Sequence, residues 1–214
     1  MRFLSPNQTH LTSPDAIRAS LTDLLSSYFT TMDRLGIKET WIAHGTLLGH
    51  YWGGHILPWD TGIDVQMSAS NMARLVSSRY NHTVHPMRLL PRRTIFNQTV
   101  RARSRPSYLL DINPYWTTPK TSVNASITWD VANKIDARWI GMSNGKFIDI
   151  TIVHEGRSGK VLLCKDGHVY LPSTIYPLHE STLDGIQVRI PANPEKVLSD
   201  EYGMPALTNK NRHW

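Results

Sequence analysis

The chain has 214 residues, of which 40% are apolar and 19% are charged, and these values are typical of one ordinary globular domain. Its single cysteine, Cys164, excludes an intrachain disulfide and a thiolate metal cluster. The net charge of +6 is compatible with an anionic ligand such as a nucleotide diphosphate, and equally with a merely basic surface. Aromatic residues do not alternate with basic ones along any stretch, so we expect no nucleic-acid partner.

The first half of the chain predicts helices that alternate with short strands. Ser13 and Pro14 are typical of a helix start, and apolar residues at helical spacing continue to Gly36, which ends the pattern. The elements expected next are a strand at 41–43, a short helix at 47–52, a turn at Gly53-Gly54, a strand at 63–67, a helix from Ser68 or Ser70 to about Tyr80, and a short strand at 83–85.

The second half predicts strands joined by hairpins. Asn144-Gly145 and Asp184-Gly185 are strong hairpin signals between apolar runs. The expected elements are strands at 108–112, 137–140, 146–152, 182–183 and 186–190, an exposed loop at 88–105, a polar connection at 114–133, and a last helix from Asn193-Pro194 to near Gly203. We therefore predict an α+β fold, with a mixed β-sheet, flanking helices and extra β-hairpins. Residues 1–12 are expected to form an N-terminal tail and residues 13–214 a single domain.

The most informative stretch runs from Trp41 to Val65. An apolar strand leads into Gly45 and Thr46, a helix follows, and the next strand carries Asp64. Backbone amides at a helix start bind phosphate, and carboxylates on the next strand bind a divalent metal, an arrangement that nucleotidyltransferases use. Gly45 and Thr46 taken alone would favour a plain strand-to-helix turn, but their distance to the acidic strand favours phosphate binding.

The acidic residues predict a metal site between two strands. Asp64 and Asp149 each lie inside an apolar run, where an acid on a sheet face needs a partner or a metal. We expect the two to share Mg²⁺ or Mn²⁺, with water in the remaining ligand positions, although ordinary strand-end acids are the alternative. Asp60 lies four residues before Asp64, about 13 Å away along a straight strand, so it joins the site only if the chain bends at Gly62. Otherwise Asp60 is a turn acid.

Other polar residues have two readings each. His44 could orient a phosphate or be a hydrogen-bonded core histidine. Arg138 could pair with Asp136 to line the site, or the two could be an ordinary hairpin charge pair. Asp111 could be a further acid of the site or a turn former. Arginines between residues 92 and 105 could meet a diphosphate or lie in a solvated loop. The tryptophans are expected in the core or in a pocket wall, where one could stack on a base: Trp41, Trp52, Trp59, Trp116 and Trp139.

Several short motifs, taken together and in order, resemble the LicD / fukutin-related family, most closely its fungal branch, from about residue 30 to the C-terminus. The motifs are His44-Gly45-Thr46-Leu47-Leu48-Gly49, Leu57-Pro58-Trp59-Asp60, Ile63-Asp64-Val65, Asp136-Ala137-Arg138-Trp139-Ile140, Phe147-Ile148-Asp149-Ile150 and Glu201-Tyr202-Gly203. The resemblance implies a nucleotidyltransferase-type fold. It also implies metal-dependent transfer of phosphocholine, ribitol phosphate or a sugar phosphate from a CDP- or GDP-linked donor to a glycan or glycoprotein.

Carried over residue by residue, the resemblance assigns catalysis and metal binding to one set of acids and phosphate binding to another set of residues. The acids are Asp60, Asp64 and Asp149. The nucleotide- or phosphate-binding residues are His44, Gly45, Thr46 and Arg138. The family has a further aspartate where this chain has Gly62, at the central metal position.

The departure at Gly62 leaves two main hypotheses. The chain is a transferase impaired at its metal site, or it is a catalytically degenerate domain that binds a glycan or nucleotide as the partner of an active enzyme. A nucleotidyltransferase acting on nucleic acid is a third, weaker alternative.

The sequence also bears on localisation. Family members in animals and fungi act in the Golgi or ER lumen, and the chain has four sequons, more than its composition predicts, at Asn7, Asn81, Asn97 and Asn124. We therefore expect the secretory pathway, with neither a signal-peptide core nor a membrane anchor in these residues.

Overall fold

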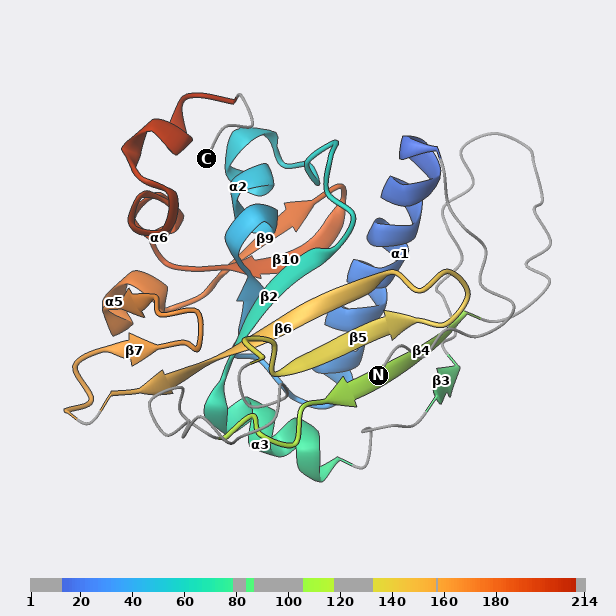
Figure 1. Cartoon of the computed structure of the whole chain (residues 1–214), viewed down its shortest axis with the longest axis horizontal. Helices are drawn as coiled ribbons and strands as arrows, with labels where there is room; N and C mark the ends of the chain where they lie inside the picture. Colours follow the sequence, from blue (N-terminus) through green and yellow to red (C-terminus); the bar gives the residue numbers. More distant parts are fainter. Residues whose placement is uncertain (1–12, 79–83, 87–105, 118–132, 157, 211–214) are drawn as a thin grey trace.

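The computed structural model describes residues 13–78, 84–86, 106–117, 133–156 and 158–210, and it is built around one mixed β-sheet (Figure 1). The helices are α1 (Pro14–Arg34), α2 (His44–Gly53), α3 (Ala69–Ser77), α5 (Pro172–Ile175), α6 (Pro194–Tyr202) and the 3-10 helix η2 (Met204–Leu207). The strands are β1 (Thr40–Ile42), β2 (Ile63–Ser68), β3 (Val84–Pro86), β4 (Ser107–Ile112), β5 (Ala137–Gly141), β6 (Phe147–Glu155), β7 (Leu162–Leu163), β8 (Val169–Tyr170), β9 (His179–Leu183) and β10 (Ile186–Ile190).

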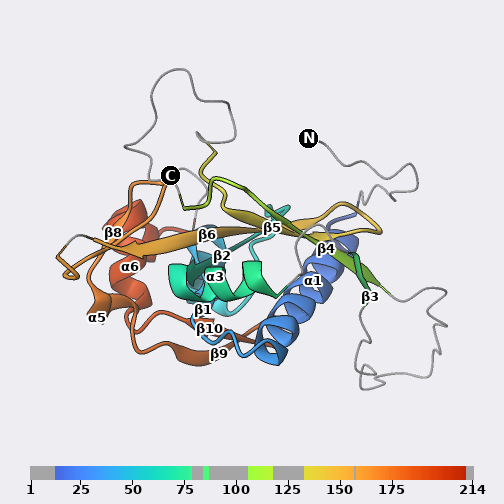
Figure 2. The ribbon, with the colours of Figure 1, turned by 90° about the horizontal axis from the view of Figure 1, so that it is seen from below.

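The main sheet has the order β1-β2-β6-β5-β4-β3, with β7 added to β6 and β8 added to β7. The β2–β6 pair is parallel, and the other pairs are antiparallel. Strands β9 and β10 form a separate two-stranded sheet. Helix α1 and this hairpin lie on one side of the main sheet (Figure 2). The predicted α+β fold with a mixed sheet and hairpins is confirmed.

Helix α1 shows why the local sequence folds as it does. The Ser13 hydroxyl accepts a hydrogen bond from the Ala16 amide at 3.1 Å, and Pro14 supplies a preset φ at the first helical position. The apolar stripe of the helix is buried, and the Trp139 indole of β5 donates to the Ser27 hydroxyl at 2.8 Å. Gly36, at φ +68°, ends the helix as its position in the pattern predicts.

The boundaries of two helices differ from the prediction. Helix α2 begins at His44 instead of residue 47, so the expected turn at Gly45 and Thr46 is the first turn of the helix itself. Helix α3, capped by Ser68, ends at Ser77. Tyr80, Thr83, the loop at 88–105, most of the connection at 114–133 and the tail at 1–12 lie outside the described residues.

The remaining elements divide into confirmed and unexpected ones. The hairpins at 144–145 and 184–185 and the last helix are confirmed. The short elements β7, β8 and α5 were not expected. None of the helices in the described part of the chain combines the length and the apolar character that a membrane span needs. The extent of the single domain over 13–214 stays a prediction.

A buried ion pair joins the end of β7 to the start of β5. Lys165 Nζ lies 2.6 Å from Asp136 Oδ1, and the side chains are 5% and 0% exposed. Lys165 also donates to the Tyr115 carbonyl at 2.9 Å, and the Ile152 amide donates to Asp136 Oδ2 at 2.8 Å. Burial raises the pKa of Asp136 to about 6, and Lys165 opposes this shift. The pair therefore holds the 164–168 turn against the sheet.

We predict that Lys165→Met lowers the free energy of unfolding by about 3 kcal/mol at pH 7.5, because the Asp136 carboxylate is then buried without its cation. The double variant Lys165→Met/Asp136→Asn should recover at least half of this loss, since it removes the buried charge. Urea unfolding curves measure both values. Lys38→Met is the control, because Lys38 pairs with Asp33 at an exposed position and its loss should cost under about 1 kcal/mol. A loss of that small size for Lys165→Met would contradict the prediction.

Candidate active site

The two principal predicted acids lie side by side on adjacent strands. Asp64 in β2 and Asp149 in β6 are direct register partners in the parallel pair. Register partners in neighbouring strands lie about 5 Å apart and point to the same face of the sheet. The β2–β6 pairing therefore places both carboxylates together, as expected from the sequence.

Asp60 joins this group because the chain bends. Strand β2 begins only at Ile63, after a bend at Gly62. A Cβ atom built on Gly45 would lie 3.7 Å from Asp64 Oδ2 and 3.9 Å from Asp60 Oδ2. Both oxygens therefore border the same small space beside the α2 backbone, in contrast to the separation expected for a straight strand.

Arg138 supplies the positive charge next to the acids. Its Nε donates to Asp149 Oδ1 at 2.6 Å, and its guanidinium carbon lies 4.4 Å from the centre of the Phe147 ring. The expected pairing of Arg138 with Asp136 is wrong, because Asp136 pairs with Lys165 and Arg138 pairs with Asp149. Asp111 in β4 is the register partner of Arg138 and extends the charged row by one strand.

The predicted phosphate-binding segment forms the first turn of α2. Its N-cap residue, Ala43, has no capping side chain, and amides in a first helical turn lack intrahelical acceptors. The Thr46 side chain is already engaged in a hydrogen bond within the fold. Its hydroxyl accepts a hydrogen bond from the Asp64 amide at 2.9 Å and the residue is 1% exposed, so it ties α2 to β2. Gly45 and the backbone thus remain as the phosphate-binding candidates of this turn.

His44 belongs to a network that sequence reasoning missed. Its Nδ1 lies 2.9 Å from Glu201 Oε2, and the Glu201 side chain is 1% exposed. The Tyr170 hydroxyl donates to Glu201 Oε1 at 2.6 Å, and the Gln66 amide nitrogen lies 3.2 Å from that hydroxyl. Alternation along β2 could have indicated Gln66, which is two residues after Asp64 and shares its face. The motif that contains Glu201 could be identified in the sequence, but its contact with His44 could not.

The electrostatics of the site are dominated by crowded carboxylates. Burial raises the pKa of Asp64 to about 6, and the charges of Asp149, Asp60 and Glu201 act in the same direction, while His44 opposes them. Burial alone would lower the pKa of His44, but the hydrogen bond and charge of Glu201 raise it above its ordinary value. The site thus has an excess of negative charge that favours a cation.

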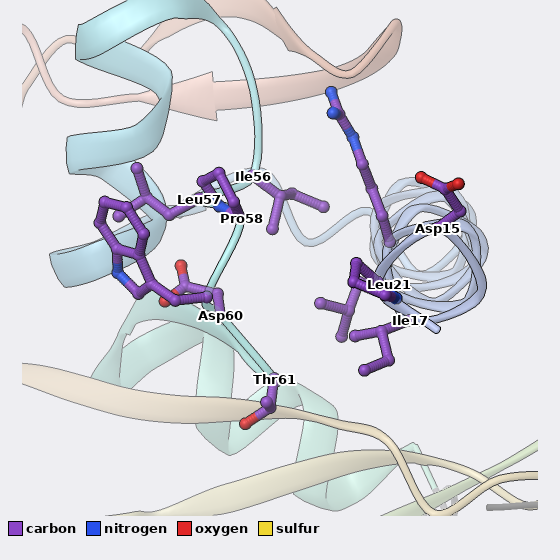
Figure 3. Close-up of a pocket in the computed structure, with 11 residues that line it drawn as sticks. Asp15, Ile17, Leu21, Ile56, Leu57, Pro58, Asp60 and Thr61 are labelled. Atoms are coloured by element: carbon purple, nitrogen blue, oxygen red, sulfur yellow. The ribbon is translucent and has the colours of Figure 1, made fainter. Parts of the chain in front are cut away.

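A cavity of about 260 Å³ opens beside Asp60, between α1 and the segment 56–61 (Figure 3). Figure 3 shows Ile17 and Leu21 of α1 on one side and Asp60 on the other. The lining is mostly apolar, with charged groups at Asp15, Arg18 and Asp60. Trp59, one of the tryptophans expected in the core or in a pocket wall, is part of the wall of this cavity. Because Asp60 borders both the cavity and the acid group, a ligand in the cavity lies next to the acids.

The acids suit a hard divalent cation as a pair. Among the described residues, Asp60, Asp64 and Asp149 do not form a set whose three ligand oxygens all lie within 4.8 Å of one another. Magnesium commonly keeps several waters and binds through one or two carboxylates. Asp64 and Asp149 therefore fit Mg²⁺ or Mn²⁺, with Asp60 near enough to contact a bound water or a substrate hydroxyl.

We predict that Asp64→Asn stabilises the metal-free protein at pH 7.5 by roughly 2–3 kcal/mol, since the folded pKa of about 6 exceeds the ordinary value of 3.8. An acid with a raised pKa contributes stability that is complete below about pH 4 and is lost as the pH rises through about 6. The gain from the substitution should therefore shrink towards zero at pH 4.5. Urea unfolding in EDTA at both pH values measures it. An equal gain in the free energy of unfolding at pH 7.5 and at pH 4.5 would contradict the raised pKa of Asp64.

Comparison with known proteins agrees with this geometry. Residues 37–139 match the family model described as LicD/FKTN/FKRP, nucleotidyltransferase domain. This match includes β1, α2, β2 and Arg138 and ends before Asp149.

Two yeast proteins are similar to the chain. Mannosyltransferase regulator 14 of Saccharomyces cerevisiae is 27% identical over 150 residues, 70% of this chain and 14% of that protein. Mannosyltransferase regulator 4 of the same yeast is 30% identical over 112 residues, 52% of this chain and 8% of that protein. The chain thus spans only a small part of the length of either relative. The resemblance to the LicD / fukutin-related family seen in the sequence is confirmed by this domain match and by the two yeast relatives.

Proposed function

We propose that the chain acts in glycan modification, as a LicD-like domain that uses Mg²⁺ or Mn²⁺ to transfer a phosphorylated group from a CDP- or GDP-linked donor to a glycan. The observation that carries this proposal is the in-register pair of Asp64 and Asp149 beside the first turn of α2. The family match supports the chemistry, and the names of the yeast relatives support a connection with mannose-containing glycans. A location in the Golgi or ER lumen follows from the same proposal.

Each residue of the group has a role in this reaction. Asp64 and Asp149 would hold the metal, which when bound neutralises the charge of the donor diphosphate. Arg138 is fixed by Asp149 through Nε, and its remaining guanidinium nitrogens suit phosphate oxygens. The amides around Gly45 add hydrogen bonds to phosphate at the helix start.

Asp60 is placed to act on the acceptor. Its carboxylate borders both the acids and the cavity. It can therefore accept the proton of an acceptor hydroxyl as that oxygen attacks the phosphorus and the nucleotide leaves with the bridging oxygen. The cavity has room for one sugar ring or one base, and the aromatic residue Trp59 is part of its lining.

The first experiment is calorimetry of the protein with Mg²⁺ or Mn²⁺ and CDP- or GDP-linked donors. We predict metal-dependent binding that Asp149→Asn weakens at least about tenfold, because one of two metal-holding carboxylates is lost. The absence of metal-dependent binding for every donor tested would overturn the proposal.

Gly62→Asp tests the missing acid directly. A Cβ on Gly62 would meet Phe147 at 3.6 Å, an ordinary contact, so the backbone has room for the Cβ atom of an aspartate. We predict that Gly62→Asp raises the affinity for Mn²⁺ roughly tenfold, equivalent to about 1.4 kcal/mol, because a further carboxylate faces the cation. Gly62→Ala is the matched control and should leave the affinity unchanged. An equal response of the two variants would show that the added carboxylate does not reach the metal.

Trp59→Ala tests the cavity. We predict a five- to tenfold loss of affinity for whichever ligand lies there, since aromatic contact contributes about 1 kcal/mol or more. Calorimetry with the donor and, separately, with short mannose oligosaccharides distinguishes the base from the acceptor sugar. Unchanged binding of both ligands would remove the cavity from the proposed function.

A second function is favoured by Gly62 itself. A LicD-like domain without turnover would bind a nucleotide or glycan and act as the partner of an active enzyme, in keeping with the word regulator in both relatives' names. It predicts donor binding without product in the wild-type chain. Release of free nucleotide together with modified glycan, detected with a labelled donor, would exclude it.

A further inference from the structure

A second group of potential metal ligands lies next to the acids. His44, His168 and Glu201 each offer one ligand atom, and these atoms all lie within 4.8 Å of one another. In the part of the chain that the structure describes, no other set of three histidine, cysteine or acidic residues meets this condition. We propose that these three residues bind a transition-metal ion of the zinc type, at a site separate from the Asp64–Asp149 pair.

The geometry of the imidazoles suits such an ion. The ring centres of His44 and His168 are 5.3 Å apart, with the planes inclined by 38°. Two imidazoles that each place a nitrogen 2.0–2.1 Å from one tetrahedral zinc ion have ring centres about 5 Å apart. The Glu201 oxygen, 2.9 Å from His44 Nδ1, completes three ligands on one side of the ion. A fourth position remains for water or for an anionic ligand.

The three ligands are held in place by the fold. His44 is the first residue of α2, His168 lies just before β8, and Glu201 lies in the last turn of α6. His44 adopts φ +48°, a left-handed conformation that costs energy in a residue with a side chain and that is often found at functional sites.

The Glu201 ligand is held in place by a neighbouring side chain. The Tyr170 hydroxyl donates to Glu201 Oε1 at 2.6 Å, and the other oxygen, Oε2, which lies 2.9 Å from His44 Nδ1, is the one that would face the ion. Such outer contacts fix the orientation of metal ligands and tune their basicity.

The donor atoms decide the kind of metal. Two imidazole nitrogens and one carboxylate favour zinc and its neighbours over magnesium, which prefers oxygen ligands throughout. The carboxylate pair of Asp64 and Asp149 has the opposite preference. A zinc ion at His44 would link α2, the 164–168 turn and α6, and would add positive charge beside the first turn of α2.

The test is zinc binding by the whole chain without any donor, measured by equilibrium dialysis and by the visible absorption of Co²⁺ in the same site. All proteins carry Asp149→Asn, so that the acid pair does not contribute. We expect one ion per chain and a tetrahedral cobalt spectrum. His168→Ala should weaken zinc binding at least about 100-fold, since the loss of outer contacts alone costs 10–100-fold.

Two further variants make the result specific. Glu201→Gln keeps the shape of the ligand and should weaken zinc binding at least about tenfold. His179→Ala, at an exposed position in β9, is the control and should change nothing. Zinc should also raise the thermal midpoint of the parent protein and leave that of His168→Ala unchanged.

The outcome is independent of the proposed function. No zinc binding by the parent protein at micromolar concentrations, or equal binding by the parent, His168→Ala and Glu201→Gln, overturns this inference. Neither result bears on magnesium-dependent donor binding, which is measured with Asp149 intact. Conversely, a chain that binds zinc through these residues and no nucleotide donor would retain the metal site and lose the proposed transferase activity.

Discussion

The parallel pairing of β2 with β6 is the constraint on which the candidate site depends. Because side chains alternate along a strand, a slip of one residue in this register would send Asp64 and Asp149 to opposite faces. The Asp64 backbone is held from the other side as well, since its amide donates to the Thr46 hydroxyl at 2.9 Å and its carbonyl accepts from the Ala43 amide at 3.0 Å. The same contacts that build the sheet edge therefore position the acids against the start of α2.

The aspartates Asp136 and Asp64 have opposite electrostatic surroundings. Asp136 has the Lys165 ammonium at 2.6 Å and a backbone amide on its second oxygen, so its charge is compensated within the fold. Asp64 lies among other carboxylates, and the side chains of Arg138 and His44 are bound to Asp149 and Glu201. The Asp64 carboxylate lowers the free energy of unfolding, and such a loss of stability is usual at functional sites. This contrast, more than the number of acids, distinguishes a site from a structural ion pair.

The elements with a clear period or a clear turn signal could be predicted from the sequence. The α1 cap and the two hairpins follow from residue types at their positions, and the facing of Asp64 and Asp149 was expected from their apolar runs and the family resemblance. The position of Asp60 could not be predicted, because a bend of the backbone at Gly62 cannot be derived from side-chain alternation. The contact of His44 with Glu201 joins residues 157 positions apart, and no local pattern reports such a distance. The two-residue strands β7 and β8 are too short to show a period.

The bend at Gly62 changes what the loss of an acid means at this position. In a straight strand, a glycine there would leave Asp64 without a carboxylate neighbour on its own strand. Here the bend returns Asp60 to the space beside Gly45, so that two acids of the segment still border the start of α2. The charge that would have stood at residue 62 is instead carried by a side chain that also borders the cavity. A site of this form keeps the negative charge that attracts a cation, while the arrangement of its carboxylates differs from that of a straight strand. In the function proposed above, cation binding is therefore the property that Gly62 preserves best, and turnover is the property that it affects most.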